Sequence, residues 1–316
     1  MKAFHLLMAL AVLLVARVSL GEDDPKPQPK PNAKQAEPRQ PRNVKITRDV
    51  EYGRAGERSL KLDLYQPAKP AAEKLPVIVW IHGGGWRGGN KSSGSNLVRF
   101  VETGNYVGVS VGYRLSGEAV WPAQIHDCKA AIRWVRANAE EYGIDPDRIG
   151  LWGSSAGGHL VSLLGTSSDI KALDGDNGSP GVSSRVACVV DYCGPSQMTV
   201  FKHPAVMQLF GSPEAHKAHS EAASPAAHVT KDDPPILIVH GTKDGTVPIS
   251  QAELFHEKLN KAGVDVTFIK IEGGGHGIGG NEITDRVTAF FEKHLRDQDV
   301  KISDEPIAFQ PPEKQN

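Results

Sequence analysis

The sequence predicts an α/β protein with a mostly parallel, doubly wound sheet of about eight strands and helices on both faces. The first observation is a set of continuous apolar runs, such as 77–81, 107–111 and 236–239, which are typical of parallel strands covered on both faces. The second is that segments with helical spacing of apolar residues, such as 250–261, alternate with these runs. The third is that glycine-rich segments follow several of the runs directly, as expected where a strand ends in a tight turn.

Two strands open the sheet as an antiparallel hairpin. The predicted strands are 44–52 and 60–65, and the glycine-containing segment 53–56 supplies the turn between them. In the second strand, Leu60, Leu62 and Leu64 alternate with polar residues. This period indicates a strand with one face in water.

The remaining strands and helices alternate along the chain. The further predicted strands are 149–152, 186–190 and 266–271. Helical spacing joins Ile125, Cys128, Ile132 and Val135 after Pro122, and a last amphipathic helix contains Ile283, Val287, Phe290 and Leu295. Residues 194–233 are irregular and rich in Pro, His and Ala, so we expect a small insertion over the functional site.

The first residues are typical of a secretory signal peptide, residues 1–21. Lys2 supplies the positive start, residues 4–16 are apolar, and Ser19 and Gly21 are small residues at the cleavage-recognition positions. The apolar segment is short for a membrane span, although an uncleaved anchor is the alternative. The sequence therefore predicts export, to the periplasm or out of the cell.

Three further regions follow the signal peptide. Residues 22–42 are rich in Pro, Lys, Gln and Glu and predict a disordered linker, because they contain too little apolar surface to fold. Residues 43–296 contain the strand and helix patterns and are predicted to form a single α/β domain. Residues 297–316 are polar and are expected to be a loosely ordered tail.

Charge and cysteine content exclude several kinds of partner and site. The formal net charge is −1, which gives no electrostatic reason to bind nucleic acid or an anionic membrane surface. Only three cysteines occur, Cys128, Cys188 and Cys193. The last two lie too far apart along an extended strand to form a disulfide without a sharp turn. We expect buried thiols, no metal site and no cofactor.

Residues 153–157 read Gly-Ser-Ser-Ala-Gly, the G-x-S-x-G pattern. An apolar strand, 149–152, precedes them and a helix-permissive run, 158–164, follows. Strand, tight turn and helix are the context of a nucleophile elbow, which lifts a serine hydroxyl clear of the sheet. Glycine-serine strings are also common in loops, so the assignment of Ser155 as nucleophile depends on the motifs below.

A serine hydroxyl needs an adjacent base, and His276 is the predicted base among twelve histidines. It lies in a glycine-rich loop after the last predicted parallel strand, from which an imidazole can reach the elbow. His159 follows Ser155 by one helical turn, and His240 ends a buried strand, so a structural role is expected for His240. Four histidines of the insertion lack ligand spacing but could contact substrate, namely His203, His216, His219 and His228.

Asp244 is the predicted acid that orients His276. It follows the strand after the insertion, so its loop is expected at the same edge of the sheet as Ser155. An aspartate in an Asp-Gly turn is the alternative explanation for this residue alone. The chain order Ser155, Asp244, His276 is the nucleophile, acid and base order of α/β-hydrolases.

The segment His82-Gly83-Gly84-Gly85-Trp86 follows a predicted central strand. Its backbone N–H groups are unobstructed by side chains, so Gly84 and Gly85, together with Ala156, are the predicted oxyanion-hole donors. A phosphate-binding loop is the competing interpretation, but the Gly-Lys-Ser/Thr ending is missing. His82 is expected to brace the loop or contact substrate, and Trp86 to line an acyl pocket or the core.

These motifs resemble those of the α/β-hydrolase superfamily over about residues 44–295. Residues 82–86 and 153–160 resemble the hormone-sensitive-lipase-like esterases, and together with 183–195 they resemble the bacterial feruloyl and acetyl-xylan esterases. The resemblance implies a metal-free serine carboxylesterase that acts through an acyl-enzyme. No long helical cap precedes His82, so the expected substrate is a small-molecule or polysaccharide ester and not a bulky lipid.

Other functions stay open at this point. Kynurenine formamidases and short-chain esterases contain similar motifs, so an arylformamidase-like hydrolase is one alternative. A peptidase resembling the prolyl oligopeptidase group is another, because that group shares the region 240–248. A catalytically silent binding protein is the third, although such proteins usually lack part of the triad. The sequence does not determine the oligomeric state.

Overall fold

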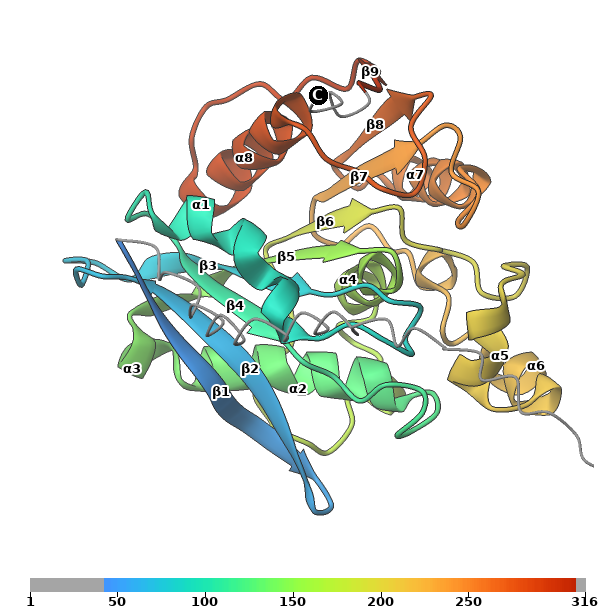
Figure 1. The fold of residues 1–316 in the computed structure, drawn as a ribbon, viewed down its shortest axis with the longest axis horizontal. Coiled ribbons are helices and arrows are strands. Elements are labelled where there is room, and N and C mark those ends of the chain that lie inside the picture. Colours follow the sequence, from blue (N-terminus) through green and yellow to red (C-terminus); the bar gives the residue numbers. More distant parts are fainter. Residues whose placement is uncertain (1–42, 311–316) are drawn as a thin grey trace, which may run out of the picture. The chain divides into compact units, whose positions relative to one another are not determined.

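The computed structural model describes residues 43–310, and within this range the strands form one nine-stranded sheet (Figure 1). The strand order is β1-β2-β4-β3-β5-β6-β7-β8-β9. The strands are β1 (Val44–Ala55), β2 (Arg58–Pro67), β3 (Leu75–Ile81), β4 (Val107–Val111), β5 (Ile144–Ser154), β6 (Cys188–Tyr192), β7 (Ile236–Gly241), β8 (Val266–Glu272) and β9 (Ile307–Ala308).

The sheet is parallel except at its first edge. β1 pairs with β2, and β2 with β4, in antiparallel fashion, whereas every other neighbouring pair is parallel. This confirms the predicted opening hairpin and the predicted α/β class. Because β3 and β5 to β8 are parallel, the loops that follow them meet at one edge of the sheet.

The ninth strand corrects the expectation for the tail. The sequence predicts a loosely ordered tail over residues 297–316, but Ile307 is buried and pairs with Ile271 of β8. The N–H of Phe309 also donates to the carbonyl oxygen of Glu272, at 2.9 Å. Although the tail is mostly polar, its Ile307 covers the edge of the sheet. Pairing at this edge satisfies the exposed backbone groups of β8.

Helices cover both faces of the sheet. The α-helices are α1 (Val98–Val101), α2 (Ala123–Ala137), α3 (Ala139–Tyr142), α4 (Ala156–Thr166), α5 (Pro204–Phe210), α6 (Pro213–His219), α7 (Ser250–Ala262) and α8 (Asn281–Arg296). Short 3₁₀ segments are η1 (Lys91–Leu97), η2 (Lys171–Leu173) and η3 (Pro225–Ala227). The predicted apolar faces of α2 and α8 are buried as expected.

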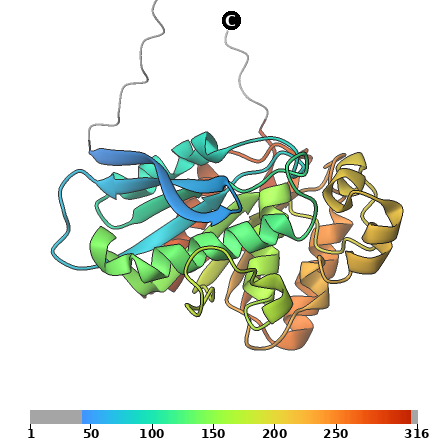
Figure 2. The same ribbon diagram turned by 90° about the horizontal axis from the view of Figure 1, so that it is seen from below.

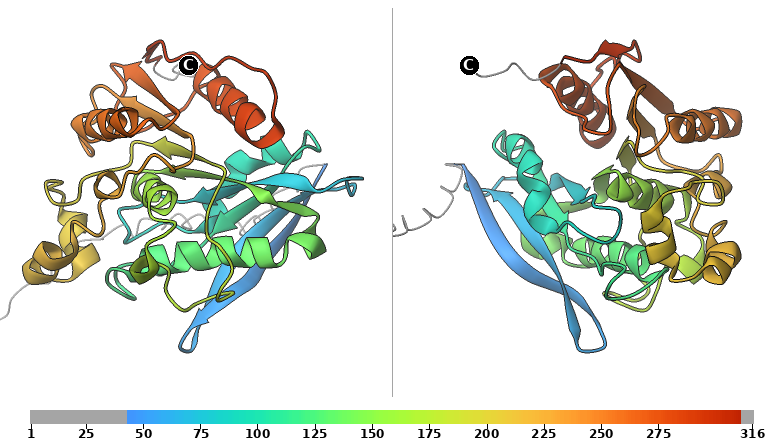
Figure 3. Two further views of the ribbon diagram at one scale, coloured as in Figure 1. Left: turned by 180° about the vertical axis from the view of Figure 1, so that it is seen from behind. Right: turned by 45° about the vertical axis from the view of Figure 1, so that its right-hand side comes forward.

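The two faces of the sheet have separate cores, and β3 shows how the strands divide between them. Val77 and Val79 pack with the apolar residues of α2, α4 and α7. Ile78, between them in sequence, packs with those of α1 and α8. This alternation follows from the strand period of two, and Figure 3 shows α1 and α8 on one side of the sheet.

The insertion at 194–233 is more regular than predicted. Figures 1 and 2 show α5 and α6 of this segment beyond the carboxyl ends of β5 and β6. Each helix begins with a capping side chain followed by proline: His203 before Pro204, and Ser212 before Pro213. The cap accepts a backbone N–H and proline needs no N–H at the first helical position, so these pairs define short helices without a long apolar pattern.

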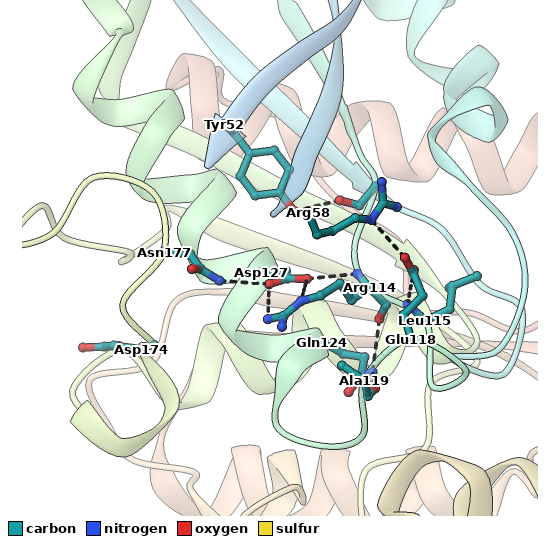
Figure 4. A network of polar contacts seen from close by, with 12 residues as sticks. Tyr52, Arg58, Arg114, Leu115, Glu118, Ala119, Gln124, Asp127, Asp174 and Asn177 are labelled. Atoms are coloured by element: carbon teal, nitrogen blue, oxygen red, sulfur yellow. Dashed lines mark hydrogen bonds and ion pairs between the residues drawn. The ribbon is translucent and has the colours of Figure 1, made fainter. Parts of the chain in front are cut away.

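A buried ion pair fixes the loop that follows β4 (Figure 4). Arg114 donates to both carboxylate oxygens of Asp127 of α2, at 2.7 and 2.8 Å, and its backbone N–H donates to the same carboxylate at 2.9 Å. Gln124 donates to the carbonyl oxygen of Arg114, and Tyr52 to that of Gly112. The network ties the loop after β4 to β1 and α2.

All three cysteines are buried free thiols, as predicted. No helix within residues 43–310 combines the length and apolar character that crossing a membrane requires. The predicted signal peptide at 1–21, the linker at 22–42 and the last part of the tail lie outside the described residues. The boundaries of the domain therefore remain predictions.

Candidate active site

Ser155 lies at a sharp turn between β5 and α4. Its φ and ψ are 57° and −120°, a strained conformation for a residue with a side chain. Its N–H donates to the carbonyl oxygen of Tyr192 at 2.7 Å, which ties the turn to β6. A Cβ on Gly153 would lie 2.3 Å from the carbonyl oxygen of Gly157, and one on Gly157 would lie 2.0 Å from that of Ile81. The G-x-S-x-G pattern is therefore required by backbone packing.

The structure brings Ser155, His276 and Asp244 together from three loops. The Nε2 of His276 lies 2.9 Å from the Oγ of Ser155, and its Nδ1 lies 2.7 Å from the Oδ2 of Asp244. With the proton on Nδ1, the imidazole donates to Asp244 and accepts from the serine hydroxyl. This is the arrangement in which a histidine can take the serine proton.

Asp244 is held as a carboxylate. Burial by itself raises its pKa, but hydrogen bonds from His240, His276 and backbone N–H groups outweigh burial and hold the pKa well below its ordinary value. The N–H groups of Thr246 and Val247 donate to Oδ1 at 2.8 and 2.9 Å. The negative charge opposite Nδ1 is therefore fixed in position and in protonation state.

His240 is a neighbour of Asp244 that the sequence did not connect to the site. Its Nε2 lies 2.8 Å from the carbonyl oxygen of Val247 and 3.3 Å from the Oδ2 of Asp244. It is fully buried, which is consistent with the expected structural role. It also packs directly against Asp244. The sequence feature that could have indicated this contact is the position of His240 four residues before Asp244. The two side chains meet only when the loop between them folds.

The predicted oxyanion donors line the same cavity as Ser155. Gly84 and Gly85 have φ of 114° and 60°, values that favour glycine, in a turn where the carbonyl oxygen of Gly84 accepts from the N–H groups of Arg87 and Gly88. Within residues 43–310, the N–H groups of Gly84, Gly85 and Ala156 have no hydrogen-bond acceptor. All three residues line the cavity that contains Ser155. Free N–H donors beside a serine hydroxyl are what a developing oxyanion requires.

We call this cavity the catalytic cavity. It encloses ≈ 470 Å³. Its lining residues are Gly83, Gly84, Gly85, Trp86, Arg87, Ser154, Ser155, Ala156, Pro195, Phe201, His203, Thr246, Val247 and His276. Pro195, Phe201 and His203 come from the predicted insertion, which therefore does border the site. Sequence reasoning did not single out Arg87, Phe201 or the 246–247 pair, because no local pattern marks them.

Trp86 and His82 occupy different places. Trp86 lines the catalytic cavity, and its Nε1 donates to the Nδ1 of His159 at 3.2 Å. His82 does not line that cavity; its Nδ1 lies 2.7 Å from the carbonyl oxygen of Gly83, and its ring stacks on Tyr113 with centroids 4.3 Å apart. Burial lowers the pKa of His82. His82 therefore braces the glycine loop, and its position does not support contact with a substrate in the catalytic cavity.

His159 is a buried structural histidine. Its Nε2 lies 2.7 Å from the carbonyl oxygen of Ala223, so it donates there and accepts from Trp86. Burial lowers its pKa to about 4. It therefore stays neutral at pH 7 and connects the floor of the catalytic cavity to the insertion.

One set of potential metal ligands lies at the site. Cys193, Asp244 and His276 have ligand atoms within 4.8 Å of one another. Burial raises the pKa of Cys193 to about 12, so its thiol stays protonated, and Asp244 and His276 are already bonded to each other. A thiolate is the form that binds a metal, so this set is poorly suited to one.

Comparisons with known proteins identify relatives of this chain. The family model BD-FAE matches residues 62–259. The probable carboxylic ester hydrolase LipM of Mycobacterium tuberculosis is 34% identical over 224 residues, which cover 67% of this chain and 51% of LipM. The esterase LipQ of the same organism is 33% identical over 69% of this chain and 53% of its own length. The chain thus spans about half the length of these curated relatives.

Among solved structures, a truncated form of a carbohydrate esterase from gut microbiota has a TM-score of 0.70 and 32% identity, covering 80% of this chain and 97% of that one. An acetyl ester-xyloside bifunctional hydrolase from Caldicellulosiruptor lactoaceticus has a TM-score of 0.60 and 28% identity, over 76% and 86% of the two chains. The predicted superfamily is thereby confirmed. The chain belongs to the BD-FAE family and has the α/β-hydrolase fold of its esterase relatives.

Proposed function

We propose that this protein is a serine carboxylesterase that hydrolyses short-acyl or aromatic-acyl esters through an acyl-enzyme. The observation that carries the proposal is the hydrogen-bonded chain from Ser155 through His276 to Asp244. Free backbone N–H groups line the same cavity. The names of LipM and LipQ support ester hydrolysis as the reaction class.

In this mechanism Ser155 Oγ attacks the ester carbonyl while Nε2 of His276 takes its proton. The carbonyl oxygen becomes negative and is stabilised by the N–H groups of Gly84, Gly85 and Ala156. The imidazolium is stabilised by the Asp244 carboxylate and then gives its proton to the departing alcohol. Water, activated by the same histidine, attacks the acyl-enzyme, releases the acid and restores Ser155.

We propose a carbohydrate ester, acetylated or feruloylated, as the substrate. Two structural neighbours support this, since one is described as a carbohydrate esterase and the other as an acetyl ester-xyloside bifunctional hydrolase. The catalytic cavity is within the usual size range of small-molecule sites, and Trp86, Phe201 and Val247 give it an apolar wall. An acyl group could lie against that wall.

The test is hydrolysis of p-nitrophenyl acetate, butyrate and octanoate, a feruloyl ester, and acetylated xylo-oligosaccharides, with Ser155→Ala protein in parallel. We expect turnover that falls with alkyl-chain length and disappears in the variant. Turnover of dipeptide anilides or of formylkynurenine in preference to every ester would replace this proposal by one of the alternative hydrolase functions. No turnover of any of these substrates would support a silent binding protein.

We also propose that the protein is exported, on the basis of the charged start and apolar segment of residues 1–21. Expression of the full chain in a bacterial host, followed by N-terminal sequencing of the periplasmic fraction, tests this. We expect a new N-terminus at residue 22. Full-length protein confined to the cytoplasm would contradict export.

A further inference from the structure

We propose that a second cavity, which shares Gly83, Gly84 and Ser154 with the catalytic cavity, is a binding site for a neutral sugar ring of the substrate. This inference rests on the proposed function and adds a location and a ligand class to it. The cavity encloses ≈ 560 Å³. We call it the aromatic cavity, because Trp80, Trp152 and Tyr192 contribute to its lining.

The aromatic cavity adjoins the reacting atoms. Gly83, Gly84 and Ser154 line both cavities, so the two are separated there by little more than backbone. A Cβ placed on Gly83 would lie 3.3 Å from the Cβ of Ser155. The His276 loop also reaches both, with His276 in one cavity and Ile278 in the other. A substrate with its ester carbonyl at Ser155 could therefore place an adjoining ring in the aromatic cavity.

The aromatic side chains are held in fixed positions. Trp80 meets Trp152 edge to face with centroids 5.2 Å apart, and Trp152 meets Tyr192 in the same way at 5.5 Å. The Nε1 of Trp80 donates to the Oγ of Ser93 at 3.0 Å. Trp152 also packs edge to face on Phe100 of α1, at 5.9 Å. A ligand would meet rings that lose little side-chain freedom on binding.

Trp80 is unusual for its place in the sheet. It belongs to β3, a strand with neighbours on both sides, yet it is only partly buried, while the residues on either side of it are buried. A tryptophan that was needed only for the core would gain more by full burial. Aromatic rings attract the positive edges of C–H bonds to their faces, and one face of a sugar ring consists of such C–H bonds.

Polar groups in the lining favour a sugar over an aromatic acyl group. The Oδ1 of Asn96 and the Nε1 of Trp152 are buried and have no hydrogen-bond partner within the described part of the chain. Both side chains line the aromatic cavity, as do Ser93 and Thr284. Sugar hydroxyls both donate and accept and are carried by most ring carbons, whereas a feruloyl ring has one hydroxyl and one methoxy group, so a sugar can pair with more of these groups.

The charge of the cavity favours a neutral sugar. Among residues 43–310, no Asp, Glu, Lys or Arg lines it, and burial lowers the pKa of its histidine, His82. The catalytic cavity, in contrast, has the exposed guanidinium of Arg87 in its lining. A uronate carboxylate would find no cation in the aromatic cavity, so an uncharged pentose or hexose fits better.

The test is calorimetric titration of Ser155→Ala protein with unesterified xylotetraose and, separately, with ferulate. We expect xylotetraose to bind, and binding to weaken at least tenfold when Trp80→Ala is added. Asn96→Ala should weaken it by about two- to tenfold, the usual effect of one hydrogen bond. Trp134→Ala is the matched control, because Trp134 lies on α2 and lines neither cavity; it should leave binding unchanged.

Several outcomes would overturn the proposal. Failure of the Ser155→Ala protein to bind xylotetraose at millimolar concentration would overturn it. Equal binding after Trp80→Ala and after Trp134→Ala would also overturn it. Ferulate that binds and displaces xylotetraose would assign the cavity to an aromatic acyl group. Because Ser155→Ala protein cannot turn over, these outcomes are independent of esterase activity, which is measured on the intact protein. If Trp80→Ala does not fold, Trp80→Phe keeps a ring but loses the bond to Ser93 and should weaken binding less.

Discussion

The catalytic cavity and the aromatic cavity share Gly83, Gly84 and Ser154, but they are built by different means. In the first, backbone contacts and charge fix the geometry, through the strained turn at Ser155 and the anchored carboxylate of Asp244. In the second, packed side chains without charge form the walls. We infer that the reaction tolerates few substitutions, whereas substrate preference can change by replacing side chains. Four predictions test this difference.

Ser155→Ala should have the largest effect. Loss of the nucleophile should lower kcat on the order of 10⁶-fold for every ester, because an acyl-enzyme cannot form. The folded state should survive, because the backbone contacts that position the turn do not involve the serine hydroxyl. Rates on p-nitrophenyl acetate and thermal unfolding measured side by side test this. A variant that retained a tenth of the turnover would remove Ser155 from the mechanism.

Asp244→Asn should come next. An amide can donate to Nδ1 of His276 and so favour the wrong tautomer, with a loss of about 10⁴-fold in kcat at neutral pH. Asp265→Asn is the control, because Asp265 is exposed and pairs with Lys293 away from the site. Steady-state kinetics of both variants should separate them by at least a hundredfold. Equal activities would show that Asp244 does not orient the base.

Gly84→Ala tests the boundary between the cavities. Its φ of 114° is unfavourable for alanine, and the new Cβ would lie 2.3 Å from the carbonyl oxygen of Gly88, so the loop must shift. Displacing an oxyanion donor should lower kcat by about 10²–10³-fold. Gly117→Ala has open space around its Cβ and should change little. Similar kcat values for the two variants would mean that the Gly84 loop does not stabilise the oxyanion.

His159→Gln should have the smallest effect on activity and a measurable effect on stability. The pKa of His159 is about 4 in the folded protein and about 6.5 when unfolded, so the unfolded chain binds more protons between these values. Stability is therefore complete above about pH 6.5 and falls toward pH 4, by roughly 3 kcal/mol from this group.

Glutamine can keep the bonds to Trp86 and Ala223 without titrating. Urea unfolding at pH 7, 5.5 and 4.5 should show a smaller loss of stability in the variant than in the natural protein. Identical pH dependence in both proteins would mean that His159 does not stay neutral in the fold. A large loss of activity at pH 7 would instead show that the floor under Trp86 is part of the catalytic geometry.

Local sequence determined the strands and the elbow. The apolar runs 77–81 and 107–111 lie within or coincide with β3 and β4, because buried parallel strands need apolar residues on both faces. Gly153 and Gly157 are dictated by contacts between neighbouring backbone segments, so their spacing is visible in the sequence. The chain order of Ser155, Asp244 and His276 predicted that they meet, since each follows a parallel strand.

Tertiary structure alone decided the features that depend on residues distant in sequence. Ile307 forms a strand only because the edge of β8 is free to pair with it. Phe201 borders Ser155 only through the path of the insertion. The aromatic cavity combines Trp80, Asn96 and Trp152 from β3, η1 and β5. A periodic pattern records which face of an element is buried, but it does not record which other element lies opposite, and a binding site depends on that second fact.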